Sequence, residues 1–167
     1  MPETNKADAR VEEDAKGKLS GETLANALGF IAFMRSCGFT TDDEYGNNFY
    51  YMGEPTCVFL CFEPHGDYLS GLWGIYNYPI CECDGFVLDE KYKEYARANV
   101  RICKGECGCP NWPRGGDQTV YGTEFKGVCS SVVCFFNPDA EALVTIKEMM
   151  EYWRVCIEKS GKPRLLN

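Results

Sequence analysis

Apolar residues recur every three to four positions in three stretches of the chain, which is the spacing of one helix face. The stretches are residues 20–38, 89–102 and 137–161. The first opens on Ser20, a residue type that caps helices, and ends at Gly38. The third opens on Asn137-Pro138-Asp139, which provides a cap, a proline at the first helical position and an early acid. We therefore expect three helices.

Five shorter stretches are rich in aromatic and β-branched residues and are bounded by turn residues, as strands are. They are Phe49–Met52, Cys57–Phe62, Tyr68–Tyr76, Thr119–Phe125 and Val128–Phe136. Together with the helices they give the order α-βββ-α-ββ-α, in which strands come as hairpins rather than alternating singly with helices. This order favours an α+β fold, with an antiparallel sheet of about five strands and helices packed on one face of it.

The length of 167 residues is that of one domain. Residues 1–18 are rich in charged residues and carry no aromatic residue, so we expect a disordered tail there. Residues 19–167 then form a single α+β domain with a Cys-rich loop at residues 103–118.

The net charge of −8 makes the chain acidic. Nucleic acids and anionic membranes are bound mainly through lysine and arginine, so this charge argues against both kinds of partner. No run of 18 apolar residues is present, and Met1–Lys6 lacks the apolar core of a signal peptide. We therefore expect a soluble protein in the cytoplasm, where thiols stay reduced.

The interpretation of the eleven cysteines depends on that compartment. Clustered cysteines in a reducing environment indicate metal or redox chemistry, and scattered ones indicate core packing. Cys103, Cys107, Cys109 and Cys129 form a cluster in and beside a loop rich in glycine and proline. Zinc prefers thiolate ligands in groups of four, and a long loop of this kind needs something to hold it.

These four cysteines therefore predict a zinc site, and four thiolates would leave no open position for catalysis, so the zinc would be structural. Two alternatives stay open, namely a redox thiol pair at Cys107 and Cys109, and loop cysteines that bind no ligand.

The remaining cysteines fall into three groups. Cys81 and Cys83 either join the same site, form a second one or are loop thiols. Cys134 is a reserve ligand, although its position in a predicted strand suggests that it faces the core. Scattered cysteines in apolar stretches behave as small hydrophobic residues of the core; they are Cys37, Cys57, Cys61 and Cys156.

Catalytic motifs are missing from the sequence. The one histidine, His65, lies in a predicted turn, and a Cys-His or Ser-His mechanism would have to use it. A lone histidine in a turn is usually a solvated surface residue. The sequence has no nucleophile elbow, zinc-protease, phosphate-loop or dinucleotide-binding motif. It therefore favours a protein that is not an enzyme.

Aromatic residues in the predicted strands offer a second type of site. Side-chain alternation places some of these rings on the sheet face opposite the core, and tyrosine and tryptophan often line surfaces for small molecules or proteins. We expect such a ligand-binding surface at Tyr51, Trp73 and Tyr76. The alternative is that these rings fill the core.

A resemblance covers a little under half of the chain, from Leu88 to Ile157. The features that carry it are Tyr95–Cys103, the Cys107 and Cys109 loop, Glu124-Phe125 before Cys129, and Phe136–Leu143. In these features the stretch resembles small uncharacterised bacterial proteins with no known activity. The resemblance implies a cysteine cluster at matching positions, in support of the metal site.

The function expected from the sequence is a zinc-stabilised binding or interaction module, whose partner is a small molecule or a protein. The alternative is a thiol-redox enzyme that uses Cys107 and Cys109.

Overall fold

The structure is a computed structural model that describes residues 6–41, 48–61, 72–77, 87–103 and 115–160. Its helices are α1 (Lys6–Lys18), α2 (Gly21–Ser36), α3 (Glu90–Ala98) and α4 (Ala140–Ser160). Its strands are β1 (Thr40–Thr41), β2 (Asn48–Tyr51), β3 (Glu54–Cys61), β4 (Trp73–Asn77), β5 (Val100–Ile102), β6 (Gly116–Val120) and β7 (Thr123–Phe136). Within these residues, none of the helices has the length and apolar character needed to cross a membrane.

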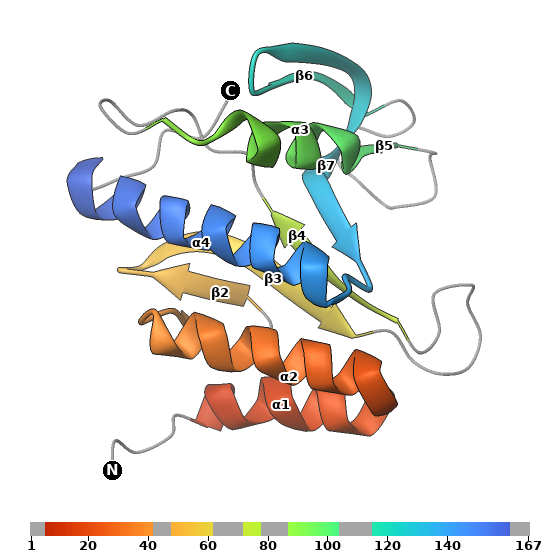
Figure 1. Ribbon diagram of the computed structural model, residues 1–167, viewed down its shortest axis with the longest axis vertical. Helices are drawn as coiled ribbons and strands as arrows, with labels where there is room; N and C mark the ends of the chain where they lie inside the picture. Colours follow the sequence, from red (N-terminus) through yellow and green to blue (C-terminus); the bar gives the residue numbers. More distant parts are fainter. Residues whose placement is uncertain (1–5, 42–47, 62–71, 78–86, 104–114, 161–167) are drawn as a thin grey trace.

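The strands form one antiparallel sheet in the order β1-β2-β3-β4-β7-β5, and β6 pairs with β7 in addition. The helices α2 and α4 lie across one face of this sheet, α1 packs against α2, and α3 lies near β7 (Figure 1). The predicted α+β fold, with helices packed on an antiparallel sheet, is confirmed. The sheet has seven strands rather than about five, because β1 and β5 have two and three residues and are too short to leave a pattern in the sequence.

An aromatic cluster joins the helices to the sheet. The ring centroid of Phe30 on α2 lies 6.1 Å from that of Trp73 on β4 and 6.4 Å from that of Phe59 on β3. Trp73 and Phe59 are 5.2 Å apart. All three side chains are buried, and α4 adds Ile146 and Trp153 to the same core. Large rings remove about 150–250 Å² each from water, so this cluster fixes the helices on the sheet.

The first helix lies where the sequence predicted a disordered tail. In the structure Lys6–Lys18 is α1, and Val11, Ala15 and the following Leu19 are buried in the core. This finding corrects the prediction for residues 6–18. Among the many charged residues stand three apolar ones, each four positions after the last. This spacing places the three apolar side chains on one face of a helix.

Two other element boundaries differ from those predicted. The helix after Asp89 ends at Ala98 rather than at about Ile102, because the next residues join the sheet as β5. The second hairpin turns at Tyr121 and Gly122, where φ is 44° and 80°. Two consecutive positive φ angles are typical of the tight turns that connect paired strands, so β7 begins five residues earlier than the predicted strand.

Replacing Ala15 by aspartate tests whether α1 belongs to the folded domain. Ala15 is fully buried, so Ala15→Asp either forces a carboxylate into the core or detaches α1. We expect it to lower the free energy of unfolding by about 3 kcal/mol. Ala9→Asp changes an exposed position of the same helix and should alter stability by less than about 0.5 kcal/mol. Urea unfolding followed by circular dichroism measures both, and equal stability of the two variants would contradict a docked α1.

Candidate metal centre

Pairing of β5 with β7 positions two of the predicted zinc ligands, Cys103 and Cys129. Ile102 pairs with Val128. The Cys103 N–H donates a hydrogen bond to the Gly127 carbonyl at 2.7 Å. In an antiparallel ladder this register places Cys103 opposite Gly127, and Cys129 two positions further along the same face. The two cysteines are therefore diagonal neighbours, whose Cα atoms are about 7–8 Å apart in such pairs.

Both ends of the Cys-rich segment meet at the same residue of β7. At one end, Cys103 bonds to Gly127. At the other end, Gly115 has a φ of 65°, and a Cβ atom there would lie 2.5 Å from the Gly127 carbonyl oxygen. Only glycine fits such a close approach with a left-handed backbone. Cys103 and Gly115, the described residues on either side of residues 104–114, therefore both approach β7 at Gly127.

Arg101 places a positive charge next to the thiols. Its guanidinium carbon lies 5.6 Å from the centroid of the Tyr76 ring and 6.0 Å from that of the Phe136 ring. Burial alone would lower the pKa of Arg101, but the neighbouring Cys134, Tyr76 and Cys129 together raise it above its ordinary value. The guanidinium therefore stays charged, and a fixed positive charge of this kind favours the thiolate form of nearby cysteines.

Cys134 is a second buried cysteine on this face of the sheet. It pairs with Tyr76 across β4 and β7 and is 5% exposed. Burial raises the pKa of Cys134 to about 12, although the Arg101 guanidinium acts in the opposite direction. Burial likewise raises the pKa of Tyr76 to about 12. The neighbouring residue Phe135, rather than Cys134, belongs to the helix-covered core, so the predicted orientation of Cys134 is corrected.

An irregularity in β7 brings these cysteines to one face. Val100 and Ile102 of β5, two positions apart, pair with residues of β7 that are five positions apart, so β7 carries extra residues here as a bulge. Cys129 and Cys134 are also five positions apart, and an odd spacing would place their side chains on opposite faces of a regular strand. Both thiols nevertheless raise the pKa of Arg101, so both lie near its guanidinium.

The described residues alone do not complete a metal site. Among them, no group of three or more histidine, cysteine, aspartate or glutamate side chains is arranged to hold a metal ion, so Cys134 does not form a three-ligand set with Cys103 and Cys129. The other candidate residues lie outside the described part of the chain; they are His65, Cys81, Cys83, Cys107 and Cys109. What the structure provides is two cysteines on one face beside a cation, a donor set that fits half of a thiolate zinc site.

The three aromatic residues predicted to bind a ligand do not form one surface. Trp73 is fully buried in the aromatic core, so its ring is not available to a ligand. Tyr76 lies three positions along the same strand, and this odd spacing turns it to the other face. Tyr51 packs on Phe39 and donates a hydrogen bond to Glu158 of α4. The prediction is corrected, because strand alternation and core filling separate the three rings.

The scattered cysteines pack as core residues where the structure describes them. Cys57 and Cys156 are buried in the core, and Cys37 packs against it while its thiol donates a hydrogen bond to Glu151 at 3.1 Å. The side chain of Cys61 is outside the described set. Cys156 is also disulfide-bonded. The prediction that Cys156 is a free core cysteine is therefore corrected.

From the sequence, Arg101 can be named only as a charge near the cysteines that would favour a thiolate, with no place in the metal site. It precedes Cys103 by two positions, and this spacing puts both side chains on one face of a strand. The three-residue strand β5 is too short to be recognised, and the sequence pattern extends the preceding helix to about Ile102 instead.

Comparison with models of known families, with curated proteins and with solved structures finds no match for the chain. The resemblance to small bacterial proteins therefore stays a prediction.

Alkylation of cysteines tests the burial of Cys57 and Cys134. Burial raises the pKa of each to about 12, and only the thiolate reacts. We therefore expect both to stay unmodified by iodoacetamide in the native protein between pH 7 and pH 9, and to react fully after unfolding in guanidinium. Peptide mass spectrometry measures each site. Rapid labelling of either residue in the native protein would show that its thiol is accessible.

Proposed function

We propose that this chain is a zinc-stabilised binding or interaction module, in which Cys103 and Cys129 supply two thiolate ligands and Cys107 and Cys109 supply the others. The observation that carries the proposal is the β5–β7 register, because it puts Cys103 and Cys129 side by side on one face. Zinc bound by four thiolates has no open coordination position. Its role would be structural, and its binding would contribute directly to folding.

The position of the Cys-rich segment supports this assignment. Cys103 and Gly115, which flank the segment, both approach β7 at Gly127. Cys107 and Cys109 are four and six residues along the chain from Cys103. A metal ion bridging this segment to β7 would hold a connection that is long for a compact domain.

Arg101 supports the proposal on electrostatic grounds. Four thiolates around one Zn²⁺ carry two net negative charges, and a buried site of that charge needs compensation. Arg101 lies beside Cys129, and its guanidinium lies near the rings of Tyr76 and Phe136. Groups that neutralise and orient metal ligands in this way tune metal affinity.

The rest of the proposal follows the composition. The acidic charge of −8 is unsuited to nucleic acid or an anionic membrane, so the partner would be a small molecule or a protein. A cytoplasmic location also belongs to the proposal.

The alternative is a thiol-redox enzyme using Cys107 and Cys109. Such an enzyme would hold no metal and would have at least one cysteine that reacts fast because its pKa is lowered.

Metal analysis of the purified protein tests the zinc proposal. We expect about one tightly bound zinc per chain, as for one closed tetrahedral site, and loss of most of it in Cys103→Ser and Cys129→Ser. Cys37→Ser is the matched control, since its thiol packs at the other side of the sheet near α4, and it should keep its zinc. A strong chelator should remove the metal and lower the melting temperature of the wild-type protein.

Metal-free wild-type protein that carries one rapidly reacting thiol would contradict the zinc site and support the redox enzyme. Counting the reactive thiols before and after the chelator distinguishes the two cases, because metal-bound thiolates become reactive only when zinc is removed.

The role of Arg101 can be tested separately from the ligands. We expect Arg101→Ala to weaken zinc binding by roughly 10–100-fold, the range typical of groups that support metal ligands. Arg101→Lys keeps the charge and should recover part of the affinity. Arg97→Ala removes an arginine from α3 that bonds Glu90 and the Tyr121 carbonyl instead. Competition with a chromophoric chelator gives the affinities, and equal values for the two alanine variants would rule out a role for Arg101.

A further inference from the structure

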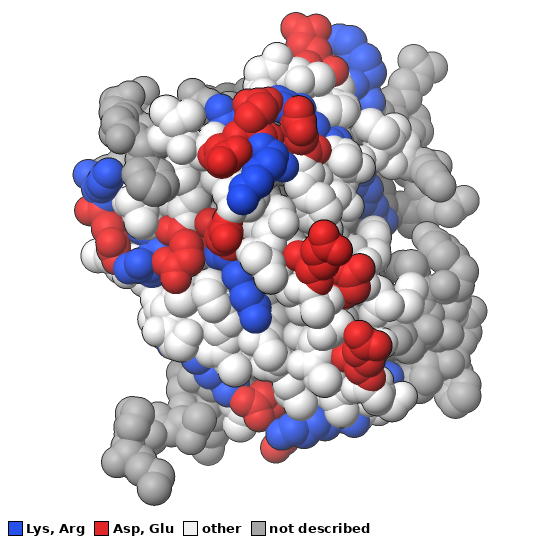
Figure 2. Space-filling model, in the orientation of Figure 1, with Lys and Arg blue, Asp and Glu red and all other residues white. Residues whose placement is uncertain are grey.

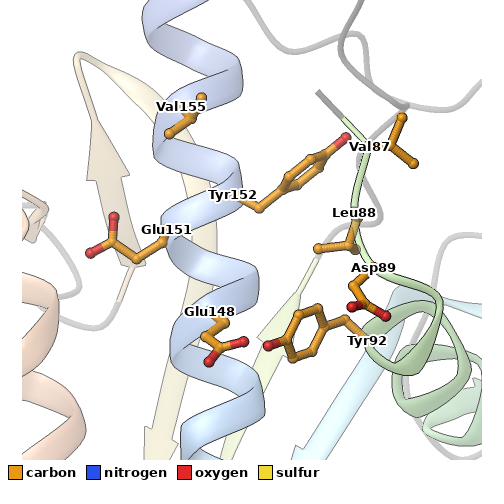
Figure 3. A pocket seen from close by; sticks show the side chains of 8 residues that line it. All are labelled: Val87, Leu88, Asp89, Tyr92, Glu148, Glu151, Tyr152 and Val155. Carbon is orange, nitrogen blue, oxygen red and sulfur yellow. The ribbon is translucent and has the colours of Figure 1, made fainter. Parts of the chain in front are cut away.

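A pocket lies between α4 and the segment that leads into α3 (Figure 3). Its volume is about 320 Å³, which is at the small end of the range of about 300–1,000 Å³ found for ligand sites. It is separate from the thiol face, because α3 and α4 belong to the helix layer on the other side of the sheet.

Two tyrosine rings and aliphatic side chains form its walls. The ring of Tyr152 points from α4 toward the segment that carries Val87 and Leu88, whereas the ring of Tyr92 points from α3 toward Glu148 on α4 (Figure 3). Leu88 is buried, and Val155 extends the wall along α4. The pocket therefore offers aromatic and apolar surface for a small organic group.

Three carboxylates border the pocket, and they differ in what they bind. Asp89 caps α3 by accepting the Lys91 N–H at 3.1 Å. Glu151 is held by the Cys37 thiol at 3.1 Å and by Arg154 at 2.9 Å. Glu148, in contrast, makes no hydrogen bond or ion pair with the described part of the chain. Glu148 is therefore the carboxylate that remains for a ligand.

The surroundings favour a cation over an anion or a neutral ligand. None of the described residues that line the pocket is basic. The ammonium of Lys91, an exposed residue, lies 4.5 Å from the centroid of the Tyr92 ring, so a ligand cation would replace Lys91 at this ring. Acidic side chains are spread over the face that carries α3 and α4, with basic ones among them (Figure 2), and the net charge of −8 attracts cations to the whole chain.

We propose that this pocket binds a small organic cation, an ammonium group joined to an aryl or short alkyl group. Glu148 pairs with the ammonium, the ring of Tyr92 adds cation–π attraction in place of Lys91, and Leu88, Tyr152 and Val155 line the space for the apolar part. This assignment names a ligand class for the binding role proposed above and rests on that role, but it does not depend on zinc.

Titration of the full chain with benzyltrimethylammonium tests the assignment, with benzyl alcohol as the neutral probe and benzenesulfonate as the anionic one. Backbone amide NMR shifts measure affinity and location together. We expect benzyltrimethylammonium to bind with shifts centred on α4 and the start of α3, and to bind more tightly than either other probe. Glu148→Gln should weaken it roughly fivefold, as for a partly exposed cation site.

The matched control is Glu141→Gln, which removes an exposed carboxylate from the first turn of the same helix and should leave the affinity unchanged. Equal binding of the cation and benzyl alcohol would overturn the proposal, as would equal effects of the two variants. Binding of a lysine-containing peptide without binding of the small cation would also overturn it and would indicate a protein partner. Zinc content is measured on the same sample, so that a protein with stoichiometric zinc and an empty pocket refutes this inference alone.

Discussion

Strand β7 is the element on which the rest of the structure depends, because three other strands pair with it. Its last residues pair with β4 and connect it to the aromatic core. Its first residues pair with β6, and its middle pairs with β5. The described cysteines of the candidate metal centre lie on β7 or directly after β5, so the centre can form only when the sheet has formed. Core packing and site geometry are therefore coupled through one strand.

Alternation along β7 gives the sheet two faces of different character. Phe135 stacks on Tyr95 of α3 at 5.4 Å and belongs to the helix-covered core. Cys134, one position earlier, is buried with Arg101 on the other face. The helix-covered face is apolar and stabilises the fold, whereas the other face carries thiols, a tyrosine hydroxyl and a guanidinium. Chemistry that needs charge is thereby kept away from the packed core, where an unpaired charge would be costly.

Much of the fold was predictable because it depends on local patterns. The apolar stripe that includes Ile146, Met150 and Trp153 predicted α4, and the hairpin order predicted an antiparallel sheet. The helix cap shows where local patterns become ambiguous. Both Asn137 and Asp139 are good caps, and the structure uses Asp139, whose carboxylate accepts the Ala142 N–H at 2.8 Å. Only the geometry of the chain at that point selects between them.

The site was less predictable, since it depends on contacts between distant residues. Cys103 and Cys129 could be named from composition and spacing, but their register came from a three-residue strand that no pattern reveals. Assigning Trp73 to a binding surface failed for a related reason, because a strand's pattern shows which residues share a face without showing which face the helices cover. To predict the position of Arg101, one would have to know both that β5 is a strand and that it pairs with β7.

Because of the bulge in β7, the number of residues in this strand matters independently of which residues they are. An odd number of extra residues reverses the alternation of side chains between the two faces of the sheet. The two cysteines on either side of the bulge therefore lie on the same face. Loss of a single residue between Cys129 and Cys134 would put them out of phase, turning one thiol toward the apolar core and a core valine outward. Gain or loss of two residues would preserve the phase. The number of residues between the cysteines thus decides whether they share a face. Substitution of neighbouring residues would leave this arrangement intact, whereas a one-residue deletion would destroy it.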